Sequence, residues 1–84
     1  MDKILKFSAS WCGPCKSLSM ILENAELKVD VESVDIDEDT VLSSKYGIRS
    51  VPTMIYVRDD VEIGRITGAQ TIEYINNWID TMNF

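Results

Sequence analysis

The chain has 84 residues, enough for one domain, and a domain of this size buries only a little over about 60% of the surface that its unfolded chain exposes. Its composition is ordinary for a globular protein, and no low-complexity or repeated segment divides it. A net charge of −6 without a basic patch disfavours nucleic acid, and no stretch approaches the roughly 20 apolar residues that span a bilayer. The N-terminus does not resemble an export signal. We therefore expect a monomeric, cytoplasmic protein with one domain over residues 1–84.

The first half of the chain predicts a strand, a helix and a second strand. A short apolar segment, 3–9, is typical of a strand that is buried on both faces. From Pro14 onward the apolar spacing is that of a helix. One face of this helix would carry Leu18, Ile21, Leu22 and Ala25. Alternation over 27–36 predicts the second strand, with an irregularity midway where the apolar frame changes at Val34.

Two further helices are marked by their capping residues. Asp39 is suited to begin a short helix, and Gly47 is suited to end it. Thr71 is suited to begin a final helix with an apolar face. The acidic segment from Asp30 to Asp39 predicts a solvated edge and loop.

Two strands separated by a tight turn complete the pattern. The segments 52–57 and 61–67 are expected to form a hairpin that turns at Asp59 and Asp60. The order is then β-α-β-α-β-β-α. Because a strand-helix-strand crossover is parallel and a hairpin is antiparallel, we expect an α/β fold with one mixed four-stranded sheet and helices on both faces.

The two cysteines of the chain, Cys12 and Cys15, lie where the first strand turns into a helix. Structural zinc needs four ligands, and with two cysteines and no histidine only a dimer that pools both pairs could supply them. A disulfide that closes so short a loop adds little stability. Two buried cysteines acting as small hydrophobic side chains remain an alternative, but that does not account for Gly13 and Pro14 between them.

Redox exchange fits the local pattern better. Cysteines at i and i+3 at the start of a helix lie on one side of it, close enough for a disulfide. Cys12 would face unpaired backbone N–H groups that favour its thiolate, which makes it the attacking sulfur, while the more buried Cys15 attacks second. Pro14 suits a first helical turn, and Gly13 leaves the approach to Cys12 open.

Three segments together resemble the thioredoxin family. They are WCGPCK at 11–16, SVPT at 50–53 and TGAQ at 67–70. The resemblance covers nearly the whole chain and implies a minimal thioredoxin-like fold, with strand order 2-1-3-4 and three flanking helices. Thioredoxins usually have an additional strand and helix before the active-site strand, so in length the chain is closer to the four-stranded core of glutaredoxin.

The resemblance also implies roles for particular residues. Pro52 would be a cis-proline packed against the cysteine pair, and Val51 would offer backbone groups to an extended substrate. Trp11 would belong to the docking surface, together with Gly13, Pro14 and Gly68. Without the resemblance, Pro52 could simply begin an edge strand and Trp11 could be a packing residue.

One position departs from the family. Thioredoxins usually bury an aspartate six residues before the first cysteine and a lysine on the neighbouring strand, where this chain has Lys6 and Ser33. A charged Lys6 would stabilise a thiolate, whereas a buried lysine resists being charged, so the sign of its effect on the pKa of Cys15 stays open. A side chain that extends to solvent is an equal alternative.

The function implied by the resemblance is reduction of protein disulfides by a Cys12/Cys15 dithiol, without a bound cofactor or metal. Electrons would come from a thioredoxin-reductase-like flavoenzyme, which uses NADPH and FAD, or from glutathione as in glutaredoxins. Substrates would be disulfide-containing proteins, and ribonucleotide reductase is a family precedent. A thioredoxin-fold interaction module with incidental redox activity is an alternative of another class, and a thiol oxidase or isomerase is a weaker one.

Overall fold

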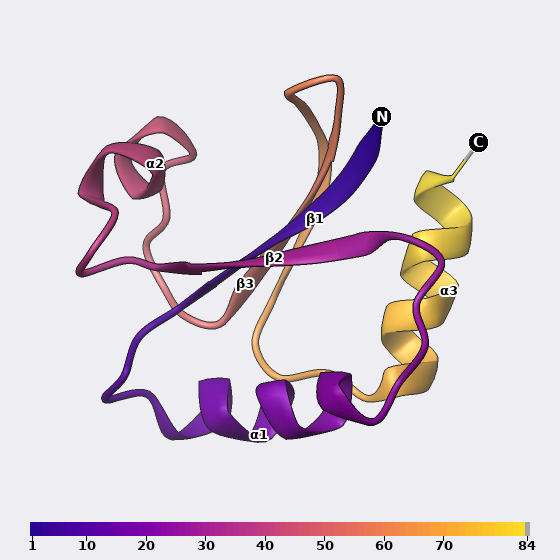
Figure 1. Ribbon diagram of the computed structural model, residues 1–84, viewed down its shortest axis with the longest axis horizontal. Coiled ribbons are helices and arrows are strands. Elements are labelled where there is room, and N and C mark those ends of the chain that lie inside the picture. Colours follow the sequence, from indigo (N-terminus) through magenta and orange to yellow (C-terminus); the bar gives the residue numbers. More distant parts are fainter. Residues whose placement is uncertain (84) are drawn as a thin grey trace.

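The computed structural model describes residues 1–83 and contains four strands and three helices (Figure 1). In chain order they are β1 (Asp2–Ser8), α1 (Gly13–Glu23), β2 (Asp30–Asp35), α2 (Thr40–Lys45), β3 (Thr53–Arg58), β4 (Val61–Thr67) and α3 (Ile72–Met82). The predicted element order is therefore confirmed.

The strands form one mixed sheet in the order β2-β1-β3-β4. β1 pairs with β2 in parallel and with β3 antiparallel, and β3 pairs antiparallel with β4. The predicted sheet is confirmed, including its strand order. Because β1 lies inside the sheet and has helices on both sides, its buried residues, Ile4 to Phe7, are consecutive rather than alternating.

Helices cover both faces of the sheet, and each face has its own apolar core. α1 and α3 pack on one face and α2 on the other (Figure 1). The core beneath α1 and α3 consists of Ile4, Leu18, Val29, Met54, Tyr56, Ile75 and Ile79. The core on the α2 side consists of Leu5, Phe7, Val34, Ile55 and Val57.

The irregularity expected within β2 is absent: Lys3 to Ser8 pair without a break with Asp30 to Asp35. Val31 packs with the α1/α3 core, and Val34 belongs to the core on the α2 side. Successive residues of a regular strand face opposite sides, so a strand with both faces covered needs apolar residues in both frames. The apparent change of frame reflects burial on two sides, and the prediction of an irregularity was wrong.

The predicted helix caps are confirmed, but α1 is shorter than its apolar face suggests. The Asp39 carboxylate accepts from Leu42 N–H at 3.0 Å, and the Thr71 hydroxyl accepts from Tyr74 N–H at 3.1 Å. α1 ends at Glu23 and leaves Ala25 outside, because the Asn24 side chain donates back to the Met20 carbonyl at 3.1 Å. Side chains of this type compete with the helical backbone and so favour helix ends.

The hairpin turns at the predicted residues. Asp59 and Asp60 have φ angles of 52° and 67°, the left-handed region that a two-residue hairpin turn requires. Farther along, the pairing shifts register between Tyr56 and Val57 opposite Gly64 and Glu62, which marks a β-bulge. Gly64 also packs closely, because a Cβ there would lie 2.5 Å from the Met82 sulfur.

An ion pair at the start of β1 makes a pH-dependent contribution to stability. Arg58 donates to both Asp2 carboxylate oxygens, at 2.9 and 2.7 Å, and the Tyr56 hydroxyl donates to one of them. The Arg58 guanidinium, and next the Tyr56 hydroxyl, hold the pKa of Asp2 well below its usual range. Because this pKa is lower in the folded state, the ionised Asp2 stabilises the fold at pH values above its unfolded-state pKa of about 3.9. That stabilisation is lost progressively as the pH falls below this value.

We therefore expect the free energy of unfolding to fall less steeply between about pH 5 and pH 2 in Asp2→Asn than in the wild type, because the substituted side chain has no carboxylate to be protonated. Urea unfolding at a series of pH values checks this. Parallel curves for the two proteins would show that Asp2 does not contribute to acid destabilisation.

Candidate active site

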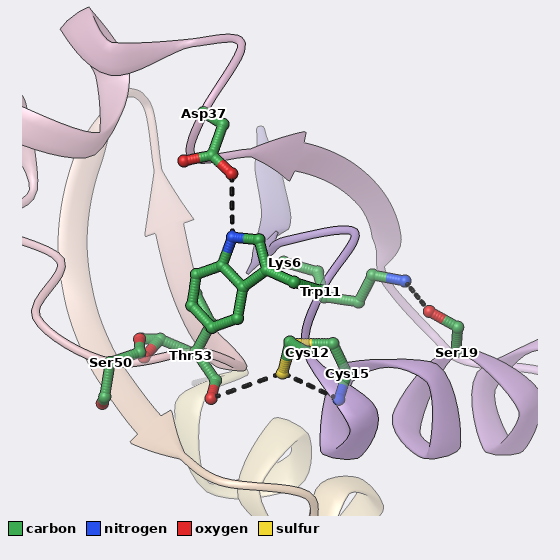
Figure 2. The surroundings of a disulfide bond; sticks show 9 residues. Lys6, Trp11, Cys12, Cys15, Ser19, Asp37, Ser50 and Thr53 are labelled. Carbon is green, nitrogen blue, oxygen red and sulfur yellow. Dashed lines mark hydrogen bonds between the residues drawn. A yellow bond between two sulfur atoms is a disulfide. The ribbon is translucent and has the colours of Figure 1, made fainter.

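Cys12 and Cys15 form a disulfide at the junction of β1 and α1 (Figure 2). Their Cα atoms are 5.3 Å apart, within the range of about 4.4 to 6.8 Å for disulfides. Cys12 is the N-cap of α1, and its sulfur accepts from the Cys15 backbone N–H at 3.1 Å. A sulfur in this position is stabilised as a thiolate by the helix N-terminus when the disulfide opens.

Both cysteines are buried, with 5% of Cys12 and 3% of Cys15 exposed. They form a small apolar cluster with Ala9, and the partly buried Ile36 and Val51 pack against it. Ile36 follows β2 and was not singled out from the sequence as part of the site. The pair is thus enclosed by the ends of β1 and β2 and by the loop before β3.

Gly13 and Pro14 form the first turn of α1, as expected. The proline lacks only an N–H that has no partner within the helix at that position. A Cβ at Gly13 would meet no atom within 4 Å, so the space above this residue is open.

The loop before β3 brings a cis-proline to the cysteine pair. The Val51-Pro52 peptide bond is cis, Pro52 is buried, and the Val51 carbonyl oxygen lies 3.7 Å from the Cys12 sulfur. Gly68, with φ at 83°, donates its N–H to the Pro52 carbonyl at 2.8 Å. The three segments of the sequence resemblance, which are far apart along the chain, therefore meet at one place.

Trp11 lies beside the pair and is largely exposed, at 67% of its surface (Figure 2). Its indole Nε1 donates to the Asp37 carboxylate at 3.0 Å, which fixes one edge of the ring. Asp37 was considered in the sequence only as part of a solvated acidic segment, and a partner 26 positions away leaves no local signal. An exposed aromatic ring with a fixed orientation is suited to contact a protein substrate.

Lys6 is buried, with 8% exposed, and its side chain does not extend freely to solvent. Its amine donates to the Ser19 hydroxyl on α1 at 2.8 Å (Figure 2), and Ser33 is its neighbour on β2. Burial lowers the pKa of the Lys6 amine, and the negative charge of Glu23 partly opposes this. The sequence pointed to Lys6 but not to Ser19.

A shallow cavity of about 300 Å³ opens beside the buried cysteine. It is lined by Ser8, Ala9, Ser10, Cys15, Lys16, Ser19, Met20 and Glu23. Cys15 and the serine that binds Lys6 therefore border the same space.

None of the helices within residues 1–83 is long and apolar enough to cross a bilayer.

A disulfide at the start of a helix, after a strand inside a mixed sheet and beside a cis-proline, defines a thiol-disulfide oxidoreductase of the thioredoxin-like class. The chain belongs to the thioredoxin family, whose sequence model matches residues 1–81.

Known relatives agree with this assignment. A thioredoxin of Chlamydia pneumoniae is 39% identical over 80 residues, which are 92% of this chain and 78% of the relative. A thioredoxin of Staphylococcus epidermidis is 33% identical over 82 residues, which are 93% of this chain and 79% of the relative. The solved structure of a mutant thioredoxin from Halobacterium salinarum superposes with a TM-score of 0.87 at 30% identity, over 95% of this chain and 73% of that one. The chain is accordingly a protein-disulfide reductase with a redox-active cysteine pair.

Proposed function

We propose that Cys12 is the attacking thiol and Cys15 the resolving thiol of this reductase. The Cys12 thiolate attacks one sulfur of a substrate disulfide, forms a mixed disulfide and releases the first substrate thiolate. Cys15 then loses its proton and attacks the Cys12 sulfur, which forms the Cys12-Cys15 disulfide and releases the second substrate thiolate. Two electrons pass from the dithiol to the substrate, and both released thiolates take up protons from solvent.

The observation that carries this assignment is the position of the two sulfurs relative to α1. The Cys12 sulfur is at the N-cap and accepts from a backbone N–H, whereas Cys15 lies inside the first turn. The helix N-terminus therefore favours negative charge at Cys12, which makes it the better nucleophile near neutral pH.

The same proposal assigns a docking surface around the pair. Trp11 supplies an exposed ring, and the open space above Gly13 and Pro14 admits the substrate. Val51 and Pro52 precede β3, where an extended substrate segment can pair with the backbone. The Gly68 N–H donates a hydrogen bond to the Pro52 carbonyl and so helps to hold that loop in place.

A thioredoxin-reductase-like flavoenzyme, drawing on NADPH through FAD, is the proposed electron donor, and disulfide-containing proteins are the proposed substrates. The cytoplasm, where thiols are kept reduced, fits this direction of electron transfer. Glutathione is the alternative donor, since the chain has the length of the glutaredoxin core.

Turbidity from reduced insulin tests the reductase assignment. With dithiothreitol as electron source, we expect the protein to accelerate insulin reduction well above the rate of dithiothreitol alone. An absence of acceleration would favour an interaction module. NADPH consumption with thioredoxin reductase, compared with consumption in glutathione plus glutathione reductase, then distinguishes the donors.

A further inference from the structure

Among residues 1–83, Lys6 is the charged side chain that is buried, and the disulfide exchange described above does not use it. It lies on β1 with Ile4 and Ser8 on the same side of the strand, so it faces the layer formed by α1 and α3. A buried lysine is costly unless its amine has partners, which makes its surroundings informative.

Those surroundings connect the Lys6 amine to Cys15. The amine donates to the Ser19 hydroxyl at 2.8 Å. Ser19 is four residues after Cys15, so the two side chains are neighbours on one face of α1, roughly 5 to 6 Å apart at their Cβ atoms. Both also border the cavity of about 300 Å³ beside the active site.

We propose that Lys6, held in place by Ser19, provides a positive charge beside Cys15 and thereby favours its thiolate in the resolving step. Lys6 is a positioning residue in this scheme, because it acts on the sulfur through space and through Ser19. This inference rests on the proposed function, which assigns the resolving step to Cys15. The proton of Cys15 leaves to solvent through the cavity, and the thiolate then attacks the Cys12 sulfur.

The charged groups around Lys6 are consistent with a protonated amine. Burial lowers the pKa of the Lys6 amine, Glu23 on α1 opposes this by favouring the ammonium form, and Ser19 accepts its hydrogen bond. In the sheet, Lys6 pairs with Ser33 on β2 and Met54 on β3, neither of which is charged. Lys16 and Glu23 border the cavity together with Cys15, so they bring one positive and one negative charge to it.

A Cys12→Ser background tests the proposal, because Cys15 is then the remaining cysteine and its thiolate can be titrated by ultraviolet absorbance. Adding Lys6→Met is expected to raise the titration midpoint of Cys15 by about one pH unit, since a favourable charge is lost without loss of volume. Lys6→Arg keeps the charge and should restore most of the shift. Ser19→Ala removes the hydrogen bond that holds the amine, so the amine can move toward Glu23. The Cys15 titration midpoint should then rise by a smaller amount.

Lys3→Met is the matched control, because Lys3 is on the same strand but on the opposite face, where its partner is Glu32 at 3.9 Å. Its titration should coincide with that of the parent. An unchanged midpoint in Lys6→Met would overturn the proposal, and so would equal shifts in Lys6→Met and Lys6→Arg, which would indicate packing rather than charge. The titration needs no turnover, so a wild-type protein that is inactive on insulin, together with a Lys6-dependent shift, would refute the proposed function and leave only the charge effect of Lys6 on Cys15.

Discussion

Cys12→Ser is expected to reduce insulin turnover to the rate of dithiothreitol alone. A serine hydroxyl at the N-cap of α1 still caps the helix, so the fold is retained while the nucleophile is lost. Cys15→Ser is expected to fail differently, because Cys12 can still attack but the mixed disulfide has no resolving thiol. Mass spectrometry without added reductant should then show a covalent adduct of the Cys15→Ser protein with its substrate, and none for Cys12→Ser.

The double substitution Cys12→Ser, Cys15→Ser is the control for both experiments. It should form no adduct, and its circular dichroism should match that of the reduced wild-type protein. An adduct that forms with Cys12→Ser and not with Cys15→Ser would reverse the two roles. Such a result would mean that the position of Cys12 at the N-cap of α1 does not decide which sulfur attacks.

Much of the fold could be predicted because its signals are local. A short, mostly apolar segment predicted β1, and helical spacing predicted α1. Asp39 and Thr71 predicted the starts of α2 and α3. Two features of β2 and α1 could not be predicted in the same way. The register of β2 depends on two packed faces, and the end of α1 depends on a hydrogen bond of the Asn24 side chain.

In the candidate site, too, features with a local sequence signal could be predicted, and features that depend on packing could not. The CGPC motif predicted a cysteine pair at a helix start from its own sequence, but the cis bond before Pro52 was expected only through family resemblance. The contacts of Trp11 with Asp37 and of Lys6 with Ser19 join segments 26 and 13 positions apart. Such contacts depend on how β1, β2 and α1 pack together, and no spacing within a short window encodes them.

Phe7→Ala is expected to destabilise the protein by about 3 to 5 kcal/mol, the usual cost of truncating a buried phenylalanine. Phe7 is fully buried in the core on the α2 side, and its ring lies 5.9 Å from that of Tyr46. Small domains are stable by only about 5 to 15 kcal/mol, so this one substitution removes a large share of the total. With a urea dependence of about 1 kcal/mol per molar for a chain of this size, the unfolding midpoint should fall by roughly 3 M or more.

Val41→Ala is the matched control, because Val41 is on α2 but is 81% exposed, and its truncation should change stability by less than about 0.5 kcal/mol. The comparison also tests whether the α2 layer belongs to the same cooperative unit as the active site. β1 carries Phe7 on one face and leads directly to Cys12, so global unfolding should expose the disulfide together with the α2 core. A Phe7→Ala protein that loses less than about 1 kcal/mol would show that this layer is loosely packed, and that the core under α1 and α3 alone maintains the site.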